Sequence, residues 1–199
     1  MGMSSGLIIT LIGVFAVLAG VAFYNRLITL KNRTFNGFSQ IEVQLQRRYE
    51  LIPNLVNTAK AYMSHEADTL KAVTEARNNA SEKCEAAAKN PEDASLVSAL
   101  ASADSVLTDA MGRLNVVMEN YPDLKADAQM RDLGEELAST ENRVAYARQA
   151  YSDSVMLYNT SREQFPAVIV ANLCSFREAD LFQVEDPVMK QAVKVSVTW

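Results

Sequence analysis

The sequence contains a single histidine, His65, which argues against most metal sites and catalytic triads. The run His65-Glu66-Ala67-Asp68-Thr69 begins like the zinc-protease helix motif, but no second histidine follows at the required spacing. A three-ligand zinc site and a di-metal site with Glu-x-x-His on two helices are therefore disfavoured. We expect no metal and no cofactor, and we interpret His65 as a surface or interhelical hydrogen-bonding residue.

Glycine and cysteine are also scarce. The seven glycines are isolated and lie mostly near the N-terminus, so no glycine-rich phosphate loop is present, and Gly-x-Ser-x-Gly is missing. Cys84 and Cys174 are far apart in the sequence and belong to no recognisable nucleophile motif. We interpret them as reduced, buried thiols in place of small apolar residues. The chain alone is not expected to be an enzyme.

There is no excess of positive charge. The 19 Lys and Arg residues are outnumbered by 24 Asp and Glu residues, and the net charge is −5. This balance lacks the basic footprint of nucleic-acid binding.

What the sequence does contain is a long apolar run at its start. Residues 1–25 include no charged side chain, and Thr10 is the one polar residue that interrupts the apolar run Leu7–Tyr24. As a helix this run would be roughly 27 Å long, close to the thickness of a bilayer core. A cleaved signal peptide is the alternative, but no basic residue precedes the run. We expect an uncleaved transmembrane anchor over residues 1–25.

The charges that flank the anchor indicate its orientation. Arg26, Lys31 and Arg33 follow the apolar run, and none precedes it. Positive charge is retained in the cytoplasm, so we predict the N-terminus outside and the bulk of the chain inside.

Gly6, Gly13 and Gly20 recur every seven residues within the anchor. Small residues on one stripe allow transmembrane helices to pack closely, which favours a homo-oligomer within the membrane lipid. The alternative is that glycine is simply frequent in membrane helices.

Residues 26–165 have the periodicity of long helices, separated by Pro53, Pro91 and Pro122. We predict an all-α fold, an antiparallel four-helix bundle whose first helix continues from the anchor and ends near Leu51–Ile52. Pro53 would open the second helix, Asn90 would cap the third, and the fourth would end near Glu163.

Glu66 and Arg77 lie on the apolar, coiled-coil-like seam predicted for the second helix. A lone buried charge is costly, so each needs a partner from another helix or access to water. We predict that Glu66 is inside the bundle and paired with a basic residue.

Residues 166–199 differ in pattern from the rest. Ala167–Leu173 is apolar and is predicted to form a short helix that caps the bundle. Val193, Val195, Val197 and Trp199 alternate with polar residues, which is typical of a strand. A strand without a partner in this chain suggests intermolecular contacts.

Several short motifs together resemble the LemA family of small bacterial membrane-anchored helical proteins. They are Tyr24-Asn25, Gln40–Leu45, Arg47-Arg48, Glu50-Leu-Ile-Pro-Asn-Leu, Lys60-x-Tyr62-x-x-His65-Glu66, Ala76-Arg77, Tyr158-Asn159, Phe165-Pro166 and Ala171–Phe182. The residues that we single out from them are Tyr24, Asn25, Gln40, Arg47, Arg48, Pro53, Asn54, Tyr62, His65, Glu66, Arg77, Phe165 and Pro166. We expect Arg47 and Arg48 to have a solvated or interhelical role.

The resemblance implies a scaffold or adaptor in the bacterial inner membrane. Such a protein would act through protein–protein interaction and self-assembly, with a membrane protein partner and a link to membrane proteolysis or envelope stress. The alternative is an accessory enzyme or regulator whose site forms between subunits.

Overall fold

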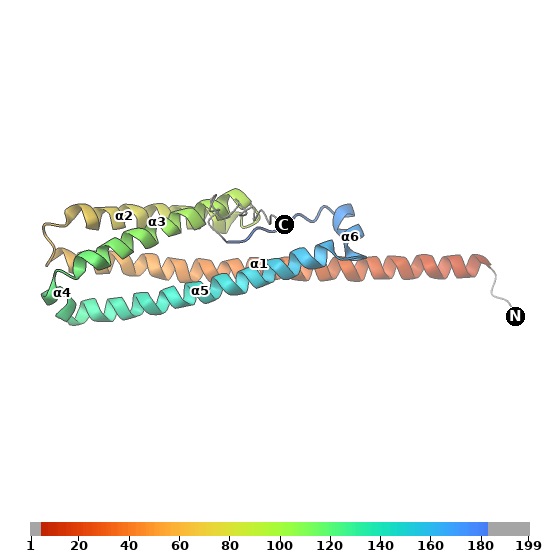
Figure 1. Ribbon diagram of the computed structural model, residues 1–199. Coiled ribbons are helices and arrows are strands. Elements are labelled where there is room, and N and C mark those ends of the chain that lie inside the picture. The colour runs from red at the N-terminus through yellow and green to blue at the C-terminus, as the bar shows by residue number, and fades with distance from the viewer. Residues whose placement is uncertain (1–4, 183–199) are drawn as a thin grey trace, which may run out of the picture.

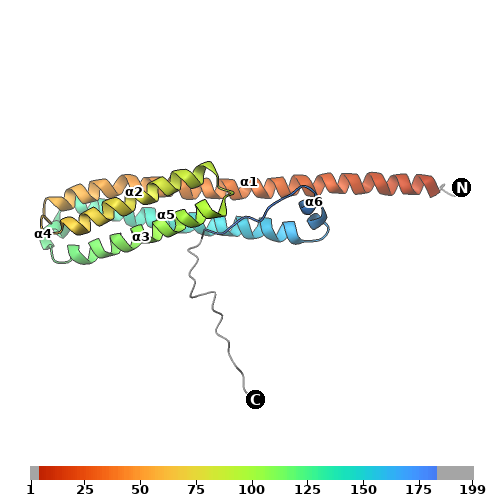
Figure 2. The ribbon, with the colours of Figure 1, turned by 90° about the horizontal axis from the view of Figure 1, so that it is seen from above.

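The computed structural model describes residues 5–182, and this range is helical with no strand (Figures 1 and 2). The helices are α1 (Ser5–Lys60), α2 (Ala67–Lys89), α3 (Ala94–Met118), α4 (Pro122–Ala126), α5 (Ala128–Glu163) and α6 (Ala167–Leu173). The predicted strand at residues 193–199 lies outside the described range.

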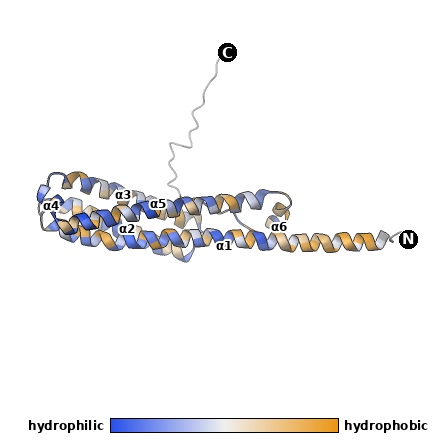
Figure 3. Cartoon of the chain, turned by 90° about the horizontal axis from the view of Figure 1, so that it is seen from below, coloured by the Kyte–Doolittle hydropathy of each residue, from blue (hydrophilic) through white to orange (hydrophobic). Residues whose placement is uncertain are grey.

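Helix α1 is 56 residues long, and its N-terminal part extends beyond the other helices (Figure 1). The side chains of this part are apolar and exposed from Leu7 to Val21, and it is long and apolar enough to cross a membrane (Figure 3). No break separates the apolar part from the part that packs against other helices, which confirms the predicted continuity. We call the remainder of the described chain, from residue 26 onward, the helical body.

The predicted break at Pro53 is wrong, because α1 runs through this residue to Lys60. Proline has no N–H, so it leaves the Tyr49 carbonyl oxygen without its usual helical donor. The Arg77 side chain on α2 fills this vacancy, since its Nε donates a hydrogen bond to the Tyr49 oxygen at 2.8 Å. The turn occurs instead at residues 61–66, and the seam predicted for one helix is divided between α1 and α2.

The start of α3 also differs from the prediction. Asp93, and not Asn90, caps the helix, and its carboxylate accepts hydrogen bonds from the Ser95 backbone N–H at 2.9 Å and hydroxyl at 2.6 Å. These hydrogen bonds hold the pKa of Asp93 below its ordinary value. The sequence offered two N-cap residues, Asn90 and Asp93, and the structure places the helix start after the second of them.

The core is built from one face of each long helix. Helix α1 packs against α5 and α2, and α2 packs against α3. The predicted apolar face of α1 is buried, as are residues at seven-residue intervals along α5. They are Leu27, Leu30, Phe38, Ile41, Leu45 and Tyr49 on α1, and Met130, Leu137, Val144, Tyr151 and Tyr158 on α5.

Gly37 lies where α1 and α5 approach most tightly. A Cβ atom at this position would be 3.2 Å from the Tyr151 Cα, so a larger residue would force the helices apart. This close approach explains a glycine in the middle of a helix, where it otherwise weakens the structure.

Helix α6 forms at the predicted residues and packs against α1 and α5. Cys174 follows it and is exposed, so the prediction that both cysteines are buried is wrong for this residue, whereas Cys84 is buried. Ser175 follows it with a φ of 57°, which reverses the chain direction. The Phe176 N–H donates to the Ala171 carbonyl at 2.9 Å, which closes the end of the helix. Residues 174–182 then run back along the body without regular structure, and we call them the C-terminal strap.

Candidate functional site

The C-terminal strap is fastened to α5 by side chains rather than by a sheet. Tyr151 donates to the Asp180 carbonyl at 2.8 Å, and Tyr158 donates to the Arg177 carbonyl at 2.7 Å. Asn159 forms a two-way bond with the Ala179 backbone, at 2.8 and 3.0 Å. Burial raises the pKa of Tyr151 to about 12, so its phenol remains a donor at neutral pH.

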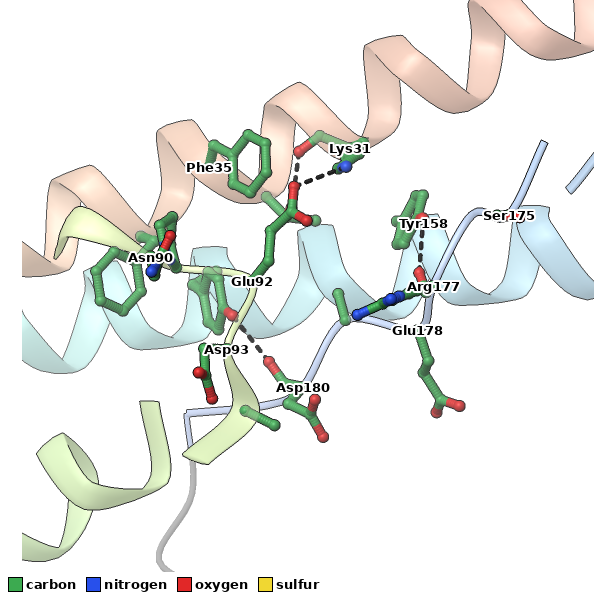
Figure 4. Close-up of a pocket in the computed structure, with 16 residues that line it drawn as sticks. Lys31, Phe35, Asn90, Glu92, Asp93, Tyr158, Ser175, Arg177, Glu178 and Asp180 are labelled. Atoms are coloured by element: carbon green, nitrogen blue, oxygen red, sulfur yellow. Dashed lines mark hydrogen bonds and ion pairs between the residues drawn. The ribbon is translucent and has the colours of Figure 1, made fainter. Parts of the chain in front are cut away.

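A cleft of about 600 Å³ lies between the strap, α1 and the α2–α3 turn (Figure 4). Its size is within the range of ligand pockets. Lys31 on α1 forms an ion pair with Glu92 in the turn at 2.6 Å, and its ammonium lies 5.6 Å from the centre of the Phe35 ring. Figure 4 shows Arg177 on the opposite wall. The cleft therefore contains positive and negative side chains, backbone groups and an aromatic ring that a bound peptide segment could contact.

Beyond the strap, the body contains a cluster of four charges whose central members, Arg48 and Asp104, are buried. Asp104 on α3 is 1% exposed and forms ion pairs with Arg48 on α1, at 3.0 Å, and with Arg148 on α5. Arg48 also reaches Glu141 and the Thr108 hydroxyl, each at 3.2 Å. The cluster thus holds two positive and two negative side chains from three helices, and its formal net charge is zero.

The strap covers this cluster. Phe182 is buried, and the Arg148 guanidinium carbon lies 4.7 Å from the centre of its ring. The strap, α5 and the buried charges therefore form one connected structure.

Tyr49 lies close to the same cluster. Its hydroxyl is buried and has no hydrogen-bond partner among the described residues. Burial, and then the negative charge of Asp104, raise the pKa of Tyr49 far above its ordinary value.

The structure separates the predicted site residues into three groups along the length of the molecule. In the first group, Arg48 is buried in the charge cluster and the exposed Arg47 forms an ion pair with Glu136. The interhelical role predicted for both arginines fits these contacts, and neither is near the apolar span. Gln40, Asn54 and the ring of Pro53 are exposed.

The second group lies at the end of the body farthest from the apolar span. Tyr62 donates to Asp127 at 3.2 Å, and His65 is exposed. The prediction that Glu66 pairs with a basic residue is wrong, since it accepts a hydrogen bond from the Tyr121 hydroxyl at 3.3 Å and forms no ion pair among the described residues. Glu66 lies in the turn before α2, and this position leaves it partly exposed.

The remaining predicted residues lie near the apolar span. The Tyr24 ring meets the Phe176 ring edge-on, with centroids 5.6 Å apart, and the Asn25 carbonyl accepts from Thr29. Phe165 is exposed and Pro166 caps α6. A Cβ atom at Gly6, Gly13 or Gly20 would meet nothing within 4 Å.

Sequence reasoning missed Asp104, Glu141 and Arg148. A signal for Asp104 was present, because Leu100, Asp104, Leu107 and Met111 share a helical face at spacings of four, three and four. An acid on an apolar seam predicts a buried partner, and the same reasoning had been applied to Glu66. The partners themselves could not be found, since they depend on how α1 and α5 are placed beside α3.

Together, the apolar helix and the body define an all-helical, membrane-associated protein. The sequence profile of the LemA family matches residues 37–197, so the chain belongs to the LemA family. It is also similar to two proteins of Paramagnetospirillum magneticum, magnetosome protein MamQ 1 and magnetosome protein MamQ 2. Each is 28% identical over 195 residues, which cover 85% of this chain and 71% of the relative. Magnetosome protein MamQ of Magnetospirillum gryphiswaldense is 26% identical over 192 residues, covering 84% and 70%.

Proposed function

We propose that this LemA-family protein is a membrane-tethered scaffold or adaptor and not an enzyme. It acts from the cytoplasmic face of the bacterial inner membrane, through protein–protein interaction and self-assembly. The observation that carries this function is the continuity of α1, because one helix forms both the apolar span and the central support of the body. A partner bound to the body is thereby held at a fixed place relative to the bilayer.

Two further features support the role of a scaffold that holds a binding surface at the membrane. The buried Arg48 and Asp104 pair with each other and with charged residues of α5, which favours a rigid antiparallel four-helix bundle over a flexible set of helices. The relatives named magnetosome proteins carry the name of a cellular structure rather than of a reaction. We include a link to membrane proteolysis or envelope stress, which rests on the family resemblance alone.

The cleft beneath the strap is the surface at which we place the partner, a membrane protein. It lies near the membrane-proximal end of the body, since Lys31 is only five residues beyond Arg26. A cytoplasmic segment that emerges from the bilayer beside α1 could therefore reach it.

Site-specific photo-crosslinking in living cells tests this assignment. A photoreactive residue at Arg177, in the cleft, is expected to capture a defined membrane protein. The matched control places the same residue at Val116, which is 67% exposed on α3 and outside the cleft. The double variant Tyr158→Phe/Asn159→Ala, which releases the strap, should abolish the Arg177 adduct. Identical adducts at both positions, or none at Arg177, would refute an adaptor role for the cleft.

Self-assembly has a separate test. The open face of Gly6, Gly13 and Gly20 suits close helix packing in the bilayer. Replacing all three with leucine should lower the mass of the detergent-solubilised particle, and so should deletion of residues 188–199. If the variants and the full-length protein all run as monomers in several mild detergents, self-assembly is not a property of this chain.

A further inference from the structure

Helix α6 turns its large apolar side chains away from the body. Ala167 and Ala171 are buried, whereas Ile169 and Leu173 on the opposite face are 58% and 84% exposed. Phe165, just before the helix, is 82% exposed. Single exposed apolar residues are ordinary, but three at four-residue spacing on one short segment indicate a contact surface. We call Phe165, Ile169 and Leu173 the α6 patch.

The α6 patch lies at the level where the apolar span of α1 ends. Phe165 and Ala167 line a small pocket together with Phe23, Arg26 and Leu27 of α1. Figure 1 shows α6 at the end of the body nearest the projecting part of α1, and Figure 3 shows apolar colouring on both. The exposed apolar surface of the span therefore continues onto α6.

The surroundings of α6 resemble those of a helix at a membrane surface. The half-exposed Tyr24 lies against Phe176, and aromatic side chains of this kind are enriched at membrane interfaces. Arg26, directly after the span, is exposed and can meet lipid headgroups. Helix α6 also runs across the direction of α1 rather than along it (Figures 1 and 2). A helix across a transmembrane segment lies along the bilayer surface.

We propose that the α6 patch is a second membrane-docking surface, which inserts into the interfacial region of the same bilayer that α1 spans. The bilayer is favoured over a second copy of the chain, because the patch is continuous with surface that already requires lipid. The inference rests on membrane insertion of α1 and not on the adaptor function, so either can fail without the other. Its consequence is that the body contacts the bilayer at two places and is prevented from swinging about the end of the span.

A polarity-sensitive probe in the full-length protein tests this docking. The native exposed Cys174 is replaced with serine, Leu173→Cys is labelled with a neutral NBD group, and the protein is reconstituted in phosphatidylcholine–phosphatidylglycerol vesicles. Cys84 is buried and remains unlabelled. We expect blue-shifted emission that is quenched by spin-labelled lipid and protected from iodide. The matched control, Val116→Cys in the same background, should show water-like emission and iodide quenching.

Two outcomes would overturn the docking surface. One is a probe at residue 173 that behaves like the probe at residue 116. The other is a blue shift that vanishes in nanodiscs holding a single chain, which would assign the patch to a second copy. The substitutions Phe165→Ser and Ile169→Ser should return the emission toward that of water, whereas Val106→Ser should not. A shift that survives these substitutions would mean that the probe, and not the patch, inserts.

Discussion

At the scale of single residues, Asp104 is a buried carboxylate that joins two arginines. It faces two arginines from different helices, and both lose a counter-charge if it is removed. A buried ion pair adds little net stability when intact, because desolvation opposes the attraction. Its loss is costly for another reason, since the buried Arg48 would keep only the half-exposed Glu141 as a counter-charge.

We therefore expect Asp104→Ala to lower the free energy of unfolding by about 3–5 kcal/mol. Glu66→Ala is the matched comparison, because Glu66 accepts one hydrogen bond from the neutral Tyr121 and is partly exposed. Its removal should cost only about 0.5–1.5 kcal/mol. Chemical denaturation of the detergent-solubilised full-length chain measures both. Equal midpoints for the two variants would contradict the buried cluster.

Cys84 gives a pH prediction. Burial raises its pKa from the ordinary 9.0 to about 12, so the folded protein holds the thiol proton more tightly than the unfolded chain does. The stability from this group is complete below about pH 9 and is lost as the pH rises toward 12. The slope is up to about 1.4 kcal/mol per pH unit.

The measurement is the unfolding free energy between pH 8 and roughly pH 11, the interval over which this linkage acts. Cys84→Ala should flatten the decline, whereas Cys174→Ala at the exposed cysteine should leave it unchanged. Because Cys84→Ala also leaves a cavity, the slopes are compared and not the absolute values. Parallel curves for wild type and Cys84→Ala would exclude a tightly protonated thiol.

At the scale of elements, α1 owes its length to a contact that proline would normally prevent. Pro53 leaves the Tyr49 carbonyl without a helical donor, and Arg77 from α2 donates to it instead. Pro53 and Arg77 were both singled out in the sequence, but as separate features. Their coupling explains why the helix does not end where the proline suggests.

A double-mutant cycle tests this coupling. Arg77→Met should destabilise the protein by about 1.5–3 kcal/mol, the cost of losing a hydrogen bond from a charged group. In a Pro53→Ala background the backbone N–H restored at this position can satisfy Tyr49, so the same substitution should cost at least about 1 kcal/mol less. Asn79→Met, at an exposed position on α2, is the control. Strictly additive effects would refute the coupling.

Apolar periodicity predicted most of the elements. The core face of α1, the extent of α5 and the position of α6 all follow from the spacing of apolar residues. Two boundaries were wrong. The end of α1 depends on a partner far away in the sequence, Arg77, and the start of α3 depended on a choice between two capping residues, Asn90 and Asp93. The path of the strap was not predicted, because side chains on α5 hold it, although Tyr158-Asn159 and Ala171–Phe182 had been noted as similar to the family.

At the scale of the whole molecule, the positive charges after the span predict that the body is cytoplasmic. A cysteine at the exposed Ser139, in a Cys174→Ser background, should resist a membrane-impermeant thiol reagent in intact cells and react after lysis. Ser161, on the same helix, is only 5% exposed and therefore unsuitable for labelling. A cysteine at Ser4, before the span, is the control that should react in intact cells. Ready labelling at residue 139 would reverse the topology.

Because α1 is continuous, a tilt of its apolar span would also tilt the part of the helix that supports the body. From Arg26 to Lys60 the helix extends for about 51 Å, so the far end of the body moves much more than the anchor does. Transmembrane helices tilt by about 20° on average, and such a tilt displaces the far end sideways by roughly 17 Å. Tilt changes with bilayer thickness, so an α1 held by the span alone would shift the far end of the body whenever the lipid composition changed. Tyr62 and His65, beyond the end of α1, would move farthest, and docking of the α6 patch would suppress this movement.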